Sequence, residues 1–126
     1  MKKEFREKDN VFIHFYKSCK YSLTGLFTSI KTERSLHLLL LACAFVLVMC
    51  IILQVSAEHV IIISMLAIFL LAMELMNTAI EHTVDMVTKE FHPLAKKAKD
   101  CGSAASFVIA VLAIIVVVYI FLTYLL

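Results

Sequence analysis

Three long runs of apolar residues alternate with short polar stretches along the chain, and each run is long enough to cross a bilayer. The runs cover residues 36–55, 60–80 and 104–126. The hydrocarbon core of a bilayer is about 30 Å thick, and about 20 apolar residues in an α-helix span it. Because a backbone in lipid must satisfy its own hydrogen bonds, each run is expected to be helical. The pattern predicts an all-α membrane protein with three transmembrane helices.

The segment before the first run has the pattern of a helix that lies on the membrane surface. Over residues 11–34, apolar side chains recur at spacings of three and four, and polar side chains occupy the rest of the helix. The apolar positions are Phe12, Phe15, Tyr16, Cys19, Leu23, Leu26, Phe27 and Ile30. This pattern is typical of an interfacial amphipathic helix. A soluble helix packed on a partner is the weaker alternative, because the next element enters the bilayer. Residues 1–10 alternate in charge and are expected to fray.

The composition agrees with a membrane protein and excludes several classes of soluble enzyme. Hydrophobic residues make up 62% of the chain and the mean hydropathy is +0.93, whereas soluble domains are about 45–50% apolar. The length of 126 residues allows one domain, residues 1–126. The charged start of the chain is not followed by a short apolar region with a cleavage site, so no cleavable signal peptide is expected. With Gly25 and Gly102 as the only glycines, neither a Walker loop nor a dinucleotide fingerprint can form.

The distribution of basic residues predicts the topology. All twelve Lys and Arg lie within residues 1–35 and 89–99. The connection over residues 54–59 has none, and no charged side chain follows Asp100. By the positive-inside rule, the N-terminus and a connection over residues 82–103 are cytoplasmic, and the C-terminus lies outside.

A polar stripe interrupts the second run, where a transmembrane helix should be apolar. Its residues are Glu74, Asn77, Glu81 and Asp85, which fall within about 80° of one another on a helix. Ionisable groups at membrane depth are costly and rare, so the stripe is a candidate functional site. Aligned carboxylates and amides are hard oxygen ligands that suit Mg²⁺ and the phosphates it accompanies. The alternative is a buried polar seam between helices of an oligomer. Three helices cannot screen the stripe from lipid on every side, so an oligomer is expected in either case.

Glu33 stands at the join between the surface helix and the first span. At a depth similar to that of Glu81, it could share a divalent cation with that carboxylate. The equal alternative is a carboxylate at a helix N-terminus, stabilised by the macrodipole. His82 flanks the stripe and is not expected to join it.

The connection over residues 82–103 is expected to break at Pro93, with a new helix beginning at residues 96–100. Lys99, adjacent to Asp100, is a candidate phosphate contact, while the neighbouring lysines serve as topology signals and headgroup contacts. Four small residues that follow allow another backbone to approach closely; they are Gly102, Ser103, Ala104 and Ala105.

The order of these polar positions resembles the signature of the small prokaryotic integral-membrane lipid kinases, the diacylglycerol kinase and undecaprenol kinase family. The matching residues are Tyr21-Ser22, Gly25-Leu26, Glu33-Arg34, Glu74-Leu-Met-Asn77-Thr-Ala-Ile-Glu81, Asp85, Glu90-Phe-His92 and Ala98-Lys99-Asp100. The resemblance extends from about Phe12 to Leu126. It is specific, because the polar positions match in order inside otherwise interchangeable hydrophobic helices.

The resemblance implies a homotrimer of three-span subunits, each with a surface helix, and active sites shared between neighbouring subunits. The implied activity is Mg²⁺- and ATP-dependent phosphorylation of a membrane lipid alcohol, undecaprenol or diacylglycerol. It takes place at the cytoplasmic face of the bacterial cytoplasmic (inner) membrane, where the protein is multi-pass with a cytoplasmic N-terminus. No nucleic-acid partner is expected.

The resemblance also assigns roles to individual residues. Glu74 is similar to the catalytic base that takes the proton of the lipid hydroxyl, and Glu33 and Glu81 match the carboxylates that hold the metal. The nucleotide-contacting positions are Tyr21, Glu33, Asn77, Glu81, Glu90, His92, Lys99 and Asp100. The positions on the lipid side are Lys17, Ser22, Glu74 and Ser103.

The chain departs from the family pattern at three positions. His14 replaces an Arg common on the surface helix, His37 stands where a basic residue is expected, and Leu39 replaces a second acid of the proteobacterial diacylglycerol kinases. Glu33-Arg34 resembles the undecaprenol kinases of Gram-positive bacteria, whereas residues 100–103 resemble the diacylglycerol enzymes. Taken together, these features favour undecaprenol.

Two other classes of protein remain as alternatives. A small cation-coupled transporter could use the acidic stripe as an ion path, but the first and third spans are almost purely apolar. A structural membrane subunit would explain an oligomer, but not a carboxylate stripe beside a nucleotide-facing connection.

Overall fold

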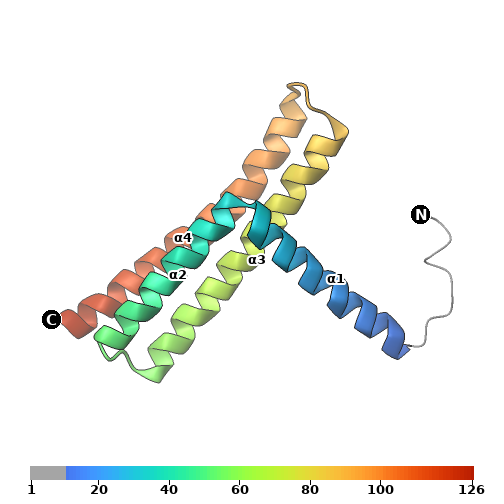
Figure 1. Ribbon diagram of the computed structural model, residues 1–126. Helices are drawn as coiled ribbons and strands as arrows, with labels where there is room; N and C mark the ends of the chain where they lie inside the picture. Colours follow the sequence, from blue (N-terminus) through green and yellow to red (C-terminus); the bar gives the residue numbers. More distant parts are fainter. Residues whose placement is uncertain (1–10) are drawn as a thin grey trace. The chain divides into compact units, whose positions relative to one another are not determined.

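The computed structural model describes residues 11–126, and every element in that range is an α-helix. The helices are α1 (Val11–Thr32), α2 (Arg34–Ile52), α3 (Ala57–Val87) and α4 (Pro93–Leu125) (Figure 1). The chain divides into two compact units, Met1–Thr32 and Glu33–Leu126. The prediction that residues 1–10 fray lies outside the described range.

The first unit contains α1. No residue of α1 is buried, and its large apolar side chains are exposed, among them Phe12 at 81% and Phe15 at 67%. The helix ends at Thr32, two residues before the predicted end of the surface segment. Most of the apolar residues on α1 are thus open to a further surface, and large exposed apolar patches mark interaction sites.

The second unit contains the three helices that are long and apolar enough to cross a membrane, which confirms the prediction of three spans. α3 packs along α4 over most of its length, whereas α2 contacts α3 over a short stretch only. Both helices are longer than the predicted apolar runs: α3 extends to Val87 beyond residue 80, and α4 begins at Pro93 rather than at residue 104. α3 has 31 residues, or about 46 Å at 1.5 Å per residue, against a hydrocarbon core of about 30 Å.

The connection between α3 and α4 is much shorter than the 82–103 segment suggested. Helix α3 continues to Val87 and α4 begins at Pro93 itself, so only residues 88–92 are non-helical. Thr88 adopts an extended conformation, with φ −152°, and ends α3. Pro93 occupies the first turn of α4, where its missing N–H would have no intrahelical partner. The hairpin of α3 and α4 projects beyond the start of α2 (Figure 1).

The turn between α2 and α3 closes α2 with paired hydrogen bonds. The N–H of Val55 donates to the carbonyl of Cys50 at 2.9 Å, and the N–H of Gln54 donates to the carbonyl of Ile51 at 3.2 Å. This is the Schellman arrangement. It requires a left-handed residue, and Gln54 supplies it with φ 52°.

A small apolar core lies next to this turn. Cys50, Ile63 and Ile120, one from each helix, are each at most 5% exposed. Leu36, at the start of α2, is also fully buried, at 0% exposed. Most other apolar side chains of the spans are half-buried or exposed, and only 6–11% of each apolar segment is buried within one chain. The remaining apolar surface is available to lipid or to other copies of the chain.

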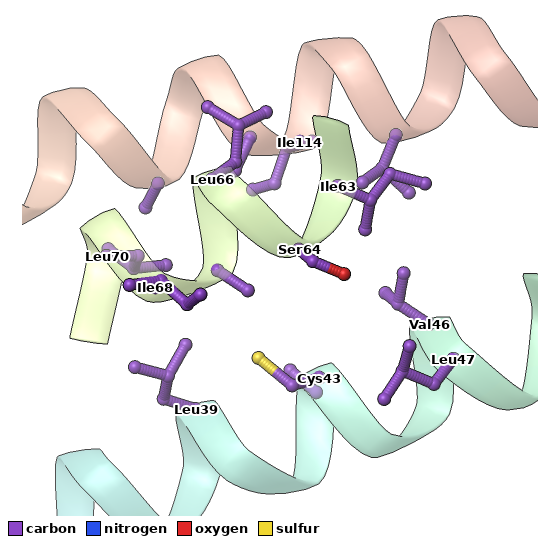
Figure 2. Close-up of a pocket in the computed structure, with 15 residues that line it drawn as sticks. Leu39, Cys43, Val46, Leu47, Ile63, Ser64, Leu66, Ile68, Leu70 and Ile114 are labelled. Atoms are coloured by element: carbon purple, nitrogen blue, oxygen red, sulfur yellow. The ribbon is translucent and has the colours of Figure 1, made fainter. Parts of the chain in front are cut away.

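An apolar groove of about 390 Å³ runs between the three helices of the second unit. Figure 2 shows Leu39, Cys43 and Leu47 on one side of it, facing Ile63 to Leu70 of α3 and Ile114 of α4. Its only hydroxyl belongs to Ser64, which donates to the carbonyl of Val60 at 2.8 Å. An apolar occupant could therefore fill the groove without leaving the Ser64 hydroxyl proton unpaired.

Candidate active site

The polar stripe lies on the second half of α3, where the helix continues beyond its apolar section. Asn77 Nδ2 donates to Glu81 Oε1 at 3.0 Å. An ionised carboxylate can only accept, so the amide nitrogen must face Glu81 and the amide oxygen must face away. Asn77 Oδ1 is buried and has no hydrogen-bond partner within residues 11–126. A buried unsatisfied acceptor is costly and is the kind of feature that a functional site retains.

Asn77 Oδ1 lies against Gly102 of α4. A Cβ atom built on Gly102 would stand 2.6 Å from Asn77 Oδ1, closer than any unstrained contact between these atoms. Gly102 is buried, and one turn further along α4 Ser106 is 4% exposed, with a hydroxyl that also lacks a hydrogen-bond partner within residues 11–126. At Asn77, the stripe thus lies against a residue that has no side chain.

Glu74 lies one turn before Asn77 on the same face of α3, and its side chain is half-buried. Among residues 11–126, its carboxylate makes no hydrogen bond or ion pair. Of the stripe's acids, Glu74 is therefore the one whose oxygens are uncommitted within a single chain.

Glu33 is held beside the stripe by a residue that the sequence did not single out. His82 Nε2 lies 3.1 Å from Glu33 Oε1, and the carboxylate accepts this bond, so Nε2 carries the proton. Glu33 is the N-cap residue of α2, yet its side chain does not cap that helix. Within residues 11–126, His82 makes no hydrogen bond or ion pair with the stripe, as the sequence predicted; its partner is Glu33, at the start of α2.

A surface hollow of about 380 Å³ lies at the tip of the α3–α4 hairpin. Four of the predicted nucleotide-contacting residues line it: Glu90, His92, Lys99 and Asp100. Lys99 Nζ donates to Asp85 Oδ1 at 2.6 Å, and Lys96 pairs with Asp100. The hollow combines three lysines, Lys89, Lys96 and Lys99, with carboxylates whose place at these lysines phosphate oxygens could take.

His92 has a structural role in this hollow. It is the N-cap of α4, and its Nδ1 accepts a hydrogen bond from the N–H of Leu94 at 3.2 Å. The imidazole proton therefore resides on Nε2, which makes that nitrogen a hydrogen-bond donor. A donor at this point suits a phosphate or a nucleotide oxygen.

Four other predicted site residues lie on α4 and on α1. Ser103 is exposed on α4, next to Gly102. Lys17, Tyr21 and Ser22 are exposed on α1, in the first unit. What the structure brings together is Asn77 with Glu81, Glu33 with His82, and the four residues of the tip hollow.

The predicted Mg²⁺ site requires oxygen donors that can converge on one cation. Among residues 11–126, no group of three or more His, Cys, Asp or Glu side chains converges on one point. The oxygen donors of Glu33 and Glu81 nevertheless fit Mg²⁺, which is commonly bound by one or two carboxylates together with substrate phosphates and water. The chain fits a metal that arrives with a nucleotide better than one held permanently.

Comparison with known proteins accords with this geometry. The sequence profile described as prokaryotic diacylglycerol kinase matches residues 20–121. The chain is 37% identical to the undecaprenol kinase of Bacillus subtilis over 117 residues, which cover 93% of this chain and 95% of that protein. It is 40% identical to the diacylglycerol kinase of Pseudomonas aeruginosa over 88 residues, 70% of this chain and 72% of that protein.

A more distant relative extends the range of the family. The diacylglycerol kinase of Escherichia coli K12 is 30% identical over 104 residues, which cover 82% of this chain and 85% of that protein. The residues that the family profile matches include the α3 stripe, the connection and the α4 entrance. The chain therefore belongs to the prokaryotic diacylglycerol kinase family and is a membrane lipid kinase.

Proposed function

We propose that this protein transfers the γ-phosphoryl group of ATP to the hydroxyl of undecaprenol, or of diacylglycerol, at the cytoplasmic face of the bacterial cytoplasmic membrane. The observation that carries the proposal is the stripe on α3. Glu74, Asn77 and Glu81 follow one another on a single face, from the apolar section toward the tip hollow. A lipid hydroxyl and a nucleotide would approach this stripe from opposite ends.

Glu74 is proposed to act as the general base. Its carboxylate takes the proton of the lipid hydroxyl while the hydroxyl oxygen forms a bond to the γ-phosphorus. The bond between that phosphorus and the β,γ-bridging oxygen breaks, and ADP leaves with the electron pair. Glu74 is suited to this step because, within residues 11–126, its oxygens are committed to no other group.

Phosphoryl transfer depends mainly on positioning and charge neutralisation. Lys99 and the Nε2–H of His92 would contact phosphate or nucleotide oxygens in the tip hollow, with Glu90 and Asp100 beside them. Asn77 would orient Glu81 through its amide hydrogen bond. Tyr21 would reach the nucleotide from α1, and Lys17, Ser22 and Ser103 would contact the lipid substrate.

Glu33 and Glu81 are proposed to hold the Mg²⁺ that accompanies ATP. When bound, the cation neutralises charge on the phosphates as the transition state forms. The contact between His82 and Glu33 would keep the Glu33 carboxylate oriented while the metal is absent. A neutral His82 can hold this position without competing for the cation.

The active protein is proposed to be a homotrimer with sites shared between subunits. The support is physical: the apolar surface of the single chain is largely uncovered, and the half-buried Glu74 cannot face lipid without a large free-energy cost. The number three comes from the family resemblance. The amphipathic α1 would lie on the cytoplasmic surface of the membrane.

Mixed oligomers test whether sites are shared. Inactive Glu74→Gln subunits combined with inactive Glu33→Gln subunits should recover part of the wild-type turnover, because some interfaces would then contain one intact set. Co-purification through two different affinity tags verifies that the oligomers are mixed. Absence of any recovery in such oligomers would place each site within one chain.

The substrate is tested by a transfer assay with γ-labelled ATP and purified protein in mixed micelles. Undecaprenol and diacylglycerol are offered in parallel at equal mole fraction, and labelled lipid phosphate is measured. Greater kcat/KM for undecaprenol is expected, in line with the Glu33-Arg34 pair and with the similarity to the Bacillus subtilis undecaprenol kinase, which extends over 95% of that protein. Preference for diacylglycerol would reverse the substrate assignment but leave the kinase mechanism intact, whereas transfer to neither lipid would contradict the proposed function.

A further inference from the structure

We infer that Gly102 is a positioning residue, which sets the Asn77 amide and, through it, the carboxylate of Glu81. The inference rests on the proposed function, since it assigns a means of holding the same site. Gly102 lies on α4, while both residues that it would position lie on α3.

The argument begins with the space around Gly102. A Cβ atom at this position would meet Asn77 Oδ1 at 2.6 Å, Ile80 Cδ1 at 3.3 Å and Asn77 Cγ at 3.6 Å. The hydrogen that occupies the Cβ position of glycine therefore points at the amide oxygen. A Cα–H···O contact of this kind is a weak hydrogen bond. Its acceptor, Asn77 Oδ1, has no other hydrogen-bond partner within residues 11–126.

Asn77 cannot yield to an added methyl group without losing its contact with Glu81. Its Nδ2 donates to Glu81 Oε1 at 3.0 Å, which determines the orientation of the amide plane. Turning the amide over would place Oδ1 against the carboxylate, where two acceptors repel each other. Rotating the side chain away would leave the Glu81 carboxylate without this donor.

The alternative response is a shift of α4 away from α3. Such a shift would also move the preceding turn of α4, which contains Lys99, and so disturb the ion pair between Lys99 and Asp85. Both responses disturb the proposed site. Both arise from the close approach of the added methyl group to the Asn77 amide, so removing that amide should relieve either one.

The chain contains a matched control for the substitution. It has two glycines, and a Cβ atom on Gly25 of α1 would meet nothing within 4 Å. Gly25→Ala and Gly102→Ala add the same methyl group within a helix and gain the same helix propensity. Any difference between the two variants therefore reports what surrounds each glycine.

The experiment is a double-mutant cycle on kcat, using full-length protein in mixed micelles. Gly102→Ala should lower kcat by about 10–10²-fold, since misplacing a catalytic group by about 1 Å has effects of that order. Gly25→Ala should leave kcat unchanged. Asn77→Ala should lower kcat by itself, and adding Gly102→Ala to Asn77→Ala should change kcat less than twofold (about 0.4 kcal/mol).

Two kinetic outcomes would overturn the inference. Full additivity of Gly102→Ala and Asn77→Ala would show that the glycine acts independently of the amide. An equal loss in Gly25→Ala and Gly102→Ala would show a general need for helical glycine. If Gly102→Ala fails to fold, recovery of folded protein in the double variant supports the inference, and failure of both variants contradicts it.

The same cycle is measured on the unfolding midpoint in detergent, which needs no activity. Gly102→Ala should lower the midpoint in the Asn77 protein and leave it unchanged or raised in the Asn77→Ala protein. This coupling distinguishes the two levels of inference. If the wild type phosphorylates neither lipid, the proposed function fails, yet the midpoint coupling still decides whether Gly102 positions Asn77.

Discussion

The two ends of the Glu33–Leu126 unit differ in how completely their polar groups are hydrogen-bonded. At the end where α2 turns into α3, which we term the Tyr124 end, the polar groups close on one another. The Tyr124 hydroxyl accepts a hydrogen bond from the N–H of Ser56 and lies 3.0 Å from His59 Nδ1. The His59 and Tyr124 rings meet edge to face, with centroids 5.7 Å apart.

At the other end, which we term the Glu74 end, polar groups are held in place without being fully satisfied. Asn77 Oδ1 is buried and unpaired, and Glu74 has no side-chain partner within residues 11–126. The lysine–carboxylate pairs of the tip hollow are partly exposed. The difference indicates that the Tyr124 end uses polar contacts for stability, whereas the Glu74 end keeps them available for ligands.

The largest effect should come from Glu74→Gln. Loss of a general base should lower kcat by about 10²–10⁴-fold, while ATP binding and the unfolding midpoint change little, because within residues 11–126 the Glu74 carboxylate has no hydrogen bond or ion pair to lose. Turnover with labelled ATP and thermal unfolding in detergent measure the two quantities. Glu58→Gln, in the first turn of α3 at the Tyr124 end, is the matched control and should retain full activity. Near-normal turnover in Glu74→Gln would remove this carboxylate from the mechanism.

The next largest effect, on Mg²⁺-dependent ATP binding, is expected for Glu33 and Glu81, the carboxylates proposed to hold the metal. Glu33→Gln and Glu81→Gln should each weaken Mg²⁺-dependent ATP binding by about tenfold or more, and the double variant should cost less than the sum because the two act on one ion. Titration of the Mg²⁺ dependence of ATP binding gives the constants. Strictly additive effects would indicate that the two carboxylates have separate structural roles.

The tip hollow predicts a selective effect of Lys99. Lys99→Gln should raise the KM for ATP by about tenfold, because it removes one charge-assisted bond to phosphate. The loss of its exposed pair with Asp85 should cost at most about 1 kcal/mol of stability. Lys97→Gln, an exposed lysine two residues earlier, tests whether charge alone matters. Equal increases in KM for both variants would point to general electrostatic attraction rather than a contact at Lys99.

At the Tyr124 end the expected order of effects is reversed. Tyr124→Phe should lower the free energy of unfolding by about 1 kcal/mol, since the Ser56 N–H loses its acceptor, and turnover should stay within twofold of wild type. Tyr119→Phe, which alters an exposed tyrosine on the same helix, should change neither quantity. A large loss of turnover with unchanged stability in Tyr124→Phe would contradict the division of roles between the two ends.

The smallest effect is expected at the turn beside this cluster. Gln54 adopts a left-handed conformation, with φ 52°, which glycine adopts without steric cost. Gln54→Gly should therefore stabilise the protein by roughly 0.5–1 kcal/mol. Chemical unfolding monitored by circular dichroism would detect the change, and a loss of stability would show that the Gln54 side chain contributes contacts beyond its backbone.

Much of the architecture could be predicted from the sequence because local physics determines it. Three apolar runs of sufficient length must become membrane-spanning helices, and the structure confirms three. The order of polar positions in those helices identified the kinase family, which the family profile confirms. The stripe of Glu74, Asn77 and Glu81 followed from helical periodicity alone. The topology, the trimer and the individual roles stay predictions.

Only the tertiary structure could decide which of these residues meet across helices. The sequence pattern identified Gly102 as a small residue, but not that it lies against Asn77 Oδ1. The pattern placed His82 beside the stripe, but could not show that its ring contacts the Glu33 carboxylate. Apolar runs also predicted where lipid begins, but α3 and α4 continue as helices through polar residues up to Val87 and from Pro93. Periodicity along one helix determines which side chains share a face, whereas the register between α3 and α4 depends on packing between residues far apart in the chain.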